Sequence, residues 1–208
     1  MREQVKKRAG YVVIALVVFI IGLVAGVLVM NKNKIFAERG ASDGTVALLS
    51  FQEIAGDSYV EVLADLKEVK RSKDPMDYLT KNSTYVLDEE AIEVYVESYI
   101  TAAESTAQAT GVTIEKLIVE EWGYESIDAY RAEAKELSLT FIKERLAVYQ
   151  IAKDKKIKVT ESDYKEQLAD YARKFGYATT EEFEYACTPV SIANEMLYEK
   201  TLGELQNN

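Results

Sequence analysis

The stretch WGYESIDAY at residues 122–130 has a counterpart in FGYATTEEF at residues 175–183. In both, an aromatic residue, a glycine and a tyrosine are followed by Ser or Thr, an acid and a further aromatic residue. Glycine tolerates the left-handed conformation that ends many helices, while Ser or Thr before an acid is typical of a helix start. Each copy therefore predicts a joint between two helices, closed by aromatic packing across the turn.

The sequence before the first joint has the signals of two helices. Asp88 and Gly111 are suitable ends for a helix over about 89–109. Its predicted apolar face holds Ile92, Tyr95, Tyr99 and Ala103. Thr113 can then cap a short helix that ends at Trp122.

The first joint predicts that Ser126 caps a long helix over about 127–154. That helix carries two apolar stripes, which predict neighbours on more than one side: Tyr130, Ala134, Leu137, Phe141 and Val148 in one, and Leu139, Ile142, Leu146 and Tyr149 in the other. Thr160 with Asp163 opens a further helix, and Pro189 suits the first turn of a last one.

The region before residue 89 is less regular. We expect a polar linker over 31–44 and an N-terminal helical extension over 45–88, while the apolar run over 46–54 is too short to assign. Asp57 or Ser58 can cap a helix in this extension. Its apolar stripe would be Tyr59, Val62, Leu63, Leu66 and Val69. The predicted fold class is all-α, an extended bundle of helical hairpins with arms.

Residues 11–30 are the strongest single signal in the chain. These twenty residues carry no charge, and at ~1.5 Å per residue they match the ~30 Å hydrocarbon core of a bilayer. The stretch is longer than the apolar region of a signal peptide, and NKNKIF follows it in place of a cleavage site. It is predicted to be a single transmembrane anchor in contact with membrane lipid.

The flanks of this anchor indicate its orientation. Residues 1–10 form a short basic tail, with slightly more Lys and Arg than the linker after the span. We expect this tail in the cytoplasm and the helical body on the extracytoplasmic side of the cell membrane. Gly22 and Gly26 have the GxxxG spacing that could support a homodimer, although such pairs are frequent in membrane helices.

Composition excludes several classes of function. A formal net charge of -10 has the wrong sign for a nucleic-acid partner. The chain has no histidine, and its lone Cys187 is best interpreted as a small buried apolar residue. Carboxylates occur in runs such as Glu120 and Glu121 that suit a solvated face, without a phosphate-binding loop or zinc spacing. We expect no enzyme activity, no catalytic residue, no metal site and no cofactor.

The segment LAVYQIAKDKKIKVTESDYKEQLADYARKFGY (146–177) resembles the C-terminal domain of bacterial trigger factor. In that family a long helix ends in an IA pair, a charged turn follows, and a VT or VS pair precedes the next helix. ATGVTIEKLIVEEWGYESIDAYRAEAKELSLTFIKERL (109–146) follows the family's order of a short and then a long helix. The resemblance covers 89–208, and the SurA-type and PrsA-type chaperones share this helical architecture.

The resemblance implies a cradle of helical arms that holds unfolded polypeptides without ATP. Residues 31–88 are too short for the family's isomerase domain, and its basic ribosome-docking loop is not found. Together with the predicted anchor, the resemblance favours a membrane-anchored chaperone that binds unfolded, nascent or exported polypeptide. A scaffold whose helical ectodomain binds one specific partner would have the same general sequence pattern.

Aromatic side chains on the predicted helices are the candidate contacts for such a client, since tyrosine and tryptophan offer a large amphipathic surface. Packing in the core is an equally good interpretation for any one of them. The candidates are Tyr95, Tyr99, Trp122, Tyr124, Tyr130 and Tyr149.

Overall fold

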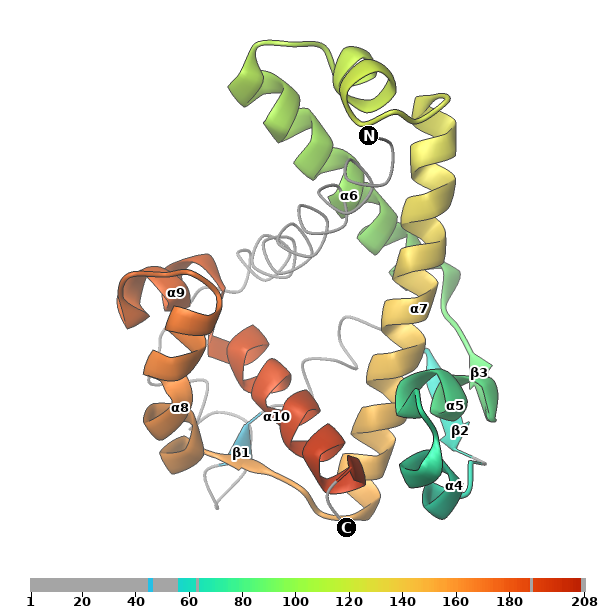
Figure 1. Cartoon of the computed structure of the whole chain (residues 1–208), viewed down its shortest axis with the longest axis vertical. Helices are drawn as coiled ribbons and strands as arrows, with labels where there is room; N and C mark the ends of the chain where they lie inside the picture. Colours follow the sequence, from blue (N-terminus) through green and yellow to red (C-terminus); the bar gives the residue numbers. More distant parts are fainter. Residues whose placement is uncertain (1–44, 47–55, 63, 188, 207–208) are drawn as a thin grey trace.

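Helices make up most of the chain in the computed structural model, which describes residues 45–46, 56–62, 64–187 and 189–206 (Figure 1). After residue 88 the elements are α6 (Glu89–Thr110), η2 (Lys116–Glu121), α7 (Ile127–Asp154), β4 (Val159–Thr160), α8 (Glu161–Lys174), α9 (Thr180–Ala186) and α10 (Pro189–Gln206). The expectation of a mainly helical body is confirmed. The predicted anchor over 11–30 lies outside the described residues. Among the helices that the structure does describe, none is long and apolar enough to cross a bilayer.

Both predicted joints are present. Gly123 and Gly176 have φ values of 80° and 83°, in the left-handed region that favours glycine. After each glycine the hydroxyl of Ser126 or Thr179 accepts a hydrogen bond from a backbone N–H at the start of the next helix, in each case at 3.1 Å. The repeated phrase therefore encodes one structural unit, used between η2 and α7 and again between α8 and α9.

The same helix ending recurs at the end of α7 without a glycine. There the Ile157 N–H donates to the Ala152 carbonyl at 2.8 Å, as the Tyr177 N–H donates to the Ala172 carbonyl at 2.9 Å after α8. The left-handed residue after α7 is Lys156, with φ 57°. A side chain in this conformation is strained, because its Cβ approaches the carbonyl oxygen too closely.

The other predicted helix ends are confirmed. The Asp88 carboxylate accepts from two N–H groups at the start of α6, and Gly111 ends that helix with φ 72°. Thr160 and Asp163 form a reciprocal capping box at the start of α8. Thr113 Oγ1 accepts from the Lys116 N–H at 3.2 Å. The short helix that follows, η2, is wound as a π-helix.

The predicted helix starting at Asp57 or Ser58 is wrong. Tyr59–Val62 is a strand, β2, which pairs antiparallel with β3 (Ser83–Val86) and packs one face on α7. The strand turns Val60 and Val62 inward and Tyr59 and Glu61 outward, a period-two pattern too short for the sequence to distinguish from a helical stripe. Asp57 and Ser58 instead hydrogen-bond to Asp88, at 3.0 Å and 2.8 Å. The described part of the 45–88 extension is therefore mixed α and β.

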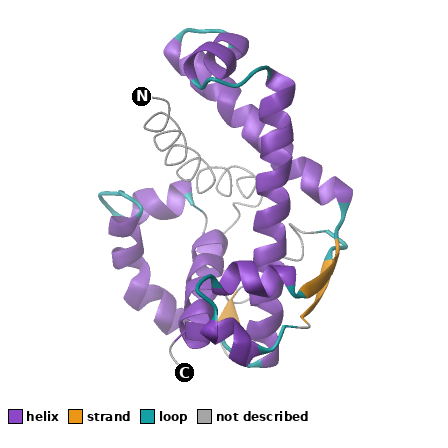
Figure 2. Cartoon of the chain, turned by 45° about the vertical axis from the view of Figure 1, so that its right-hand side comes forward, coloured by secondary structure: helices purple, strands orange, loops and turns teal. Residues whose placement is uncertain are grey.

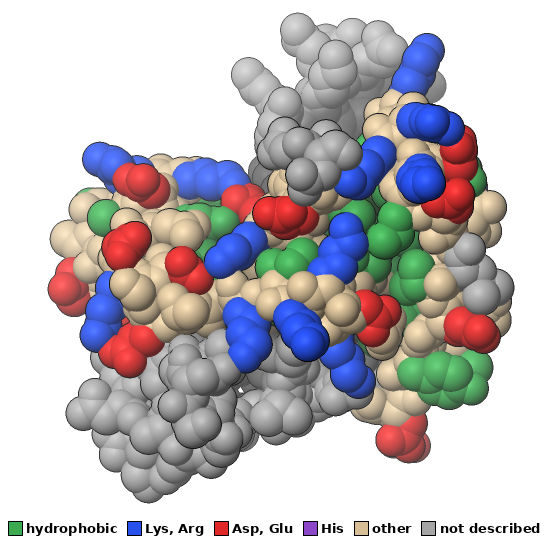
Figure 3. All heavy atoms as spheres, turned by 90° about the horizontal axis from the view of Figure 1, so that it is seen from below, with side chains coloured by type: hydrophobic (Ala, Val, Ile, Leu, Met, Phe, Trp, Pro, Cys, Tyr) green, Lys and Arg blue, Asp and Glu red, His purple; other side chains and the backbone are tan. Residues whose placement is uncertain are grey.

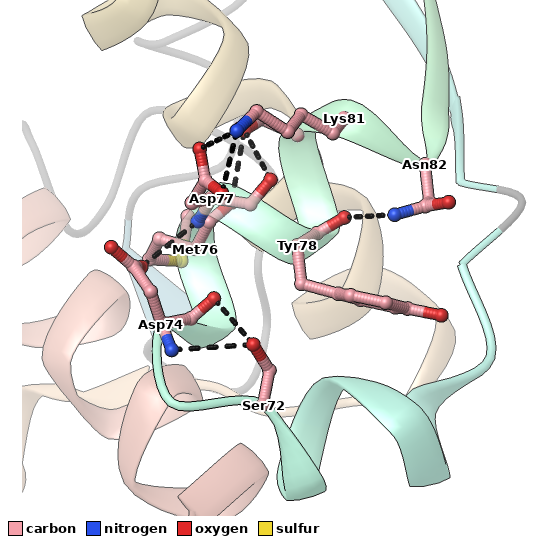
Figure 4. A network of polar contacts seen from close by, with 8 residues as sticks. Ser72, Asp74, Met76, Asp77, Tyr78, Lys81 and Asn82 are labelled. Carbon is pink, nitrogen blue, oxygen red and sulfur yellow. Dashed lines mark hydrogen bonds and ion pairs between the residues drawn. The ribbon is translucent and has the colours of Figure 1, made fainter.

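Two short helices connect β2 to β3. α4 (Leu66–Arg71) is capped by Asp65 and α5 (Pro75–Lys81) by Asp74, whose carboxylate accepts from the Asp77 N–H at 3.0 Å. Figure 4 shows α5, in which Lys81 Nζ donates to the Asp77 carboxylate one turn earlier, at 2.8 Å. Leu79 and Val69 are fully buried, so both helices cover the C-terminal half of α7.

α7 is in contact with elements on several sides, as its two stripes predict. α6 lies against its first half, while α10, α5 and β2 lie against the rest (Figure 1). At the contact with α10, the Arg145 guanidinium lies between the rings of Phe141 and Tyr198, at 5.1 Å and 3.9 Å from their centroids. It also pairs with Glu195 at 2.5 Å. Only 12% of the Arg145 side chain is exposed, so this contact is almost closed to water.

Lys156→Gly is expected to raise the free energy of unfolding by about 0.5–1 kcal/mol, because glycine removes the left-handed strain at a small cost in chain entropy. Urea denaturation followed by circular dichroism measures the change. The neighbouring Lys155 has φ −86°, so Lys155→Gly should lower stability instead. A fall in stability for both variants would show that Lys156 is not strained in its left-handed conformation.

Arg145→Ala should lower the free energy of unfolding by about 2–4 kcal/mol, because Glu195 and two aromatic rings lose a buried partner. Arg173→Ala is the matched control, since Arg173 pairs with Asp170 while 76% of its side chain is exposed. That pair should contribute less than about 0.5 kcal/mol. If urea titrations give equal losses in the free energy of unfolding for the two variants, the buried position of Arg145 adds no stability beyond that of an exposed pair.

Candidate functional site

Two helical arms extend from the body of the molecule (Figure 2). We define the first arm as α6, η2 and the N-terminal half of α7, and the second arm as α8 and α9. α10 lies between the second arm and the C-terminal half of α7 (Figure 1). We take the surface of the two arms as the candidate site, because side chains on extended arms are the most accessible to a partner.

The tip of the first arm brings four of the six predicted site residues together. Trp122 and Tyr124 both pack on Tyr130, with ring centroids 5.5 Å and 5.1 Å away. The Tyr130 hydroxyl in turn donates to the Tyr99 carbonyl at 3.3 Å. Tyr99 and Tyr130 are buried, whereas Trp122 and Tyr124 are half-buried and present part of their rings to solvent.

The remaining two predicted site residues lie nearer to α10. Tyr95 packs against Phe141 with a centroid separation of 5.5 Å, and the Tyr149 hydroxyl donates to the Asn194 carbonyl at 3.2 Å. Only 7% of Tyr95 and 5% of Tyr149 is exposed. Four of the six candidates thus serve core packing here, and only Trp122 and Tyr124 are partly open to solvent.

Burial makes these phenols poor acids. Burial raises the pKa of Tyr99 and of Tyr124 to about 12, and it raises the pKa of Tyr95, Tyr130 and Tyr149 as well. All five therefore stay neutral near pH 7. They can contribute apolar surface and hydrogen bonds, but no negative charge.

The second arm has a matching aromatic cluster that the site prediction left out. Phe183 stacks on Phe175 at 5.6 Å and contacts Tyr177 at 5.1 Å. The Tyr177 hydroxyl also lies 3.8 Å from the Sγ of Cys187. Cys187 is buried, as predicted, and burial raises the pKa of its thiol. The repeated phrase was the signal that could have identified this cluster.

In the described part of the chain five large apolar side chains are exposed, and none of them was among the predicted site residues. Val94 on α6 and Leu137 on α7 are 48% and 37% exposed, and Tyr185 on α9 is 93% exposed. Tyr59 and Val86 face each other across the β2–β3 pair and are 60% and 46% exposed. Apolar side chains are thus exposed on both arms and on the β2–β3 pair.

The first arm is also strongly acidic. Residues 89–136 contain twelve Asp and Glu against three Lys and Arg. Arg131 pairs with Glu93 and Glu97, and Lys135 pairs with Glu89 at 3.2 Å. Most of the remaining carboxylates face solvent. Their negative charge would attract polypeptide segments that carry basic residues. Among the described residues there is no group of three or more carboxylates or cysteines placed to hold a metal ion.

Comparison with known protein families gives a match over most of the chain. The family described as bacterial trigger factor protein (TF) C-terminus matches residues 57–205, more than two thirds of the chain. Neither the comparison with curated proteins nor that with solved structures finds a match. The matched segment starts at the turn before β2 and ends within α10, so it includes both arms and the β2–β3 pair. The chain belongs to the family of the bacterial trigger factor C-terminal domain.

Proposed function

We propose that this protein is a membrane-anchored, ATP-independent chaperone-like protein that binds unfolded or exported polypeptides. The observation that carries the proposal is family membership over residues 57–205, since this domain in trigger factor suggests chaperone-like binding of polypeptide. Anchoring through residues 11–30 is the part of the proposal that comes from sequence alone. Such an anchor would restrict the clients to unfolded polypeptides near the membrane surface.

The exposed apolar side chains of the two arms are the proposed client contacts. Val94 and Leu137 on the first arm and Tyr185 on the second offer separate small patches. The half-exposed rings of Trp122 and Tyr124 add to them at the tip of the first arm. Scattered patches of this kind suit weak contact with many extended chains better than one rigid, shape-matched partner.

Binding, and no chemical step, is the proposed activity. The tyrosines at the arm tips have raised pKa values and stay neutral, and the acidic residues of α6 lie on solvated surface. Release of a client then depends on its own folding, because each apolar group that folding buries is withdrawn from the arms. This cycle requires no nucleotide and no cofactor.

The full chain in lipid nanodiscs should suppress the aggregation of a chemically unfolded model protein during refolding without ATP. Light scattering should fall as the chain is added and reach a minimum near equimolar amounts. Empty nanodiscs are the control. Absence of suppression by a folded, helical chain would contradict the proposal, and would favour a scaffold that binds one specific partner.

The triple variant Val94→Ser, Leu137→Ser and Tyr185→Ser should need at least about tenfold more protein for half-maximal suppression. A tenfold change requires the loss of only ~1.4 kcal/mol of binding free energy, which the removed apolar surface can supply. The triple variant Gln108→Ser, Thr140→Ser and Gln167→Ser is the matched control, because it changes exposed uncharged residues on the same arms. Equal activity of the two variants would exclude the exposed apolar residues as client contacts.

A further inference from the structure

One end of this acidic protein is basic. Residues 65–73 and 153–158 together contain eight Lys and Arg against three Asp and Glu, although the whole chain has a net charge of -10. We define the basic end as these two segments. The first contains α4, and the second is the turn between α7 and β4.

Packing brings the two segments of the basic end together. Val69 of α4 lies in one buried cluster with Ile151, near the end of α7, and Leu205, near the end of α10. Figure 1 shows α4 and the turn after α7 along the same lower edge of the molecule. Figure 3, which views the molecule from that side, shows Lys and Arg side chains across the face, with Asp and Glu side chains among them.

The lysines of the turn are available to a partner. Lys153, Lys155 and Lys156 are exposed, and none of them forms an ion pair with another residue in the described part of the chain. The backbone that carries them is nevertheless fixed. Lys200 Nζ donates to the Lys158 carbonyl at 2.8 Å and to Asp163 at 3.1 Å, which ties the turn to α10 and α8.

The first described element of the chain lies beside this turn. β1 (Thr45–Val46) pairs antiparallel with β4, so that Val46 lies opposite Val159. Lys158 is the next residue before Val159. The linker predicted over 31–44 ends immediately before β1, and the predicted anchor precedes that linker. The tether to the predicted anchor therefore joins the described body beside the basic end.

We propose that the basic end binds the anionic headgroups of the bilayer in which the chain is anchored. Lysine ammonium groups donate to lipid phosphates, and each lysine near such a surface strengthens the association about fivefold. The acidic first arm has no such attraction to the surface, since residues 89–136 have the opposite charge balance. The body is thus held with its basic end on the membrane and its first arm directed away.

This proposal goes beyond client binding and rests on the predicted anchor. A membrane surface is favoured over an acidic protein as the occupant, because tethering beside the basic end gives the lipid a high effective concentration. Aggregation suppression does not depend on the contact, so the two proposals can fail separately.

The test uses the full chain in nanodiscs that contain nitroxide-labelled lipid. A fluorophore is attached through Ser162→Cys, beside the basic end, or through Ser105→Cys on the first arm, since both serines are exposed. Unmodified chain controls for labelling at the buried Cys187. With phosphatidylglycerol present, quenching at position 162 should be at least twofold higher than with phosphatidylcholine alone. The rise should be lost in 0.5 M salt, where the Debye screening length is only about 4 Å. Quenching at position 105 should stay low in both lipids.

Lys153→Glu with Lys155→Glu should abolish the rise in quenching at position 162. The matched control is Lys116→Glu with Arg173→Glu, which makes the same change in charge on the two arms, away from position 162, and should leave the rise intact. Equal quenching in both lipids, or equal effects of the two variants, would overturn the proposal. Binding of polyglutamate in place of lipid, dependent on the same lysines, would also overturn it and assign the basic end to acidic polypeptide.

Discussion

The contact between α7 and α10 determines how the two arms are placed. α7 continues directly into the first arm, and α10 follows the second arm in the chain. Arg145 joins the two helices through Glu195 and through the ring of Tyr198, in a position where little water can replace either contact. A guanidinium suits this position, because its flat faces stack on aromatic rings while its edge pairs with a carboxylate. Both arms can then project without much direct packing on each other.

Separate arms explain the distribution of aromatic residues. Each arm is too thin to have a large core of its own, so aromatic rings close its tip, around Tyr130 in one arm and Phe183 in the other. The rings needed for stability are thereby withdrawn from solvent. Smaller apolar residues such as Val94 and Leu137 lie on the exposed faces of the helices, where the proposed client could contact them. The acidic first arm and the basic end further give the molecule a charge polarity that total composition conceals.

The candidate site was less predictable from sequence than the fold. A tyrosine at helical spacing has the same pattern whether it packs inward or binds a partner, and Tyr95 and Tyr149 proved to be inward. Arg145 gave no signal, because one basic residue inside an apolar stripe is usually assigned to the edge of that stripe. Its partner Glu195 lies fifty residues away in the chain, and only folding brings the two together.

The sequence by itself determined the helices after residue 88, their ends and the two joints, because capping and left-handed glycines act within a few residues. It also determined the family, through the order of those elements. Only the tertiary structure decided that Tyr59–Val62 is a strand, since its partner Ser83–Val86 must first be brought beside it. It likewise decided which aromatic rings are buried, and that two separate lysine-rich segments share one end. These properties depend on contacts between distant residues, for which local periodicity contains no information.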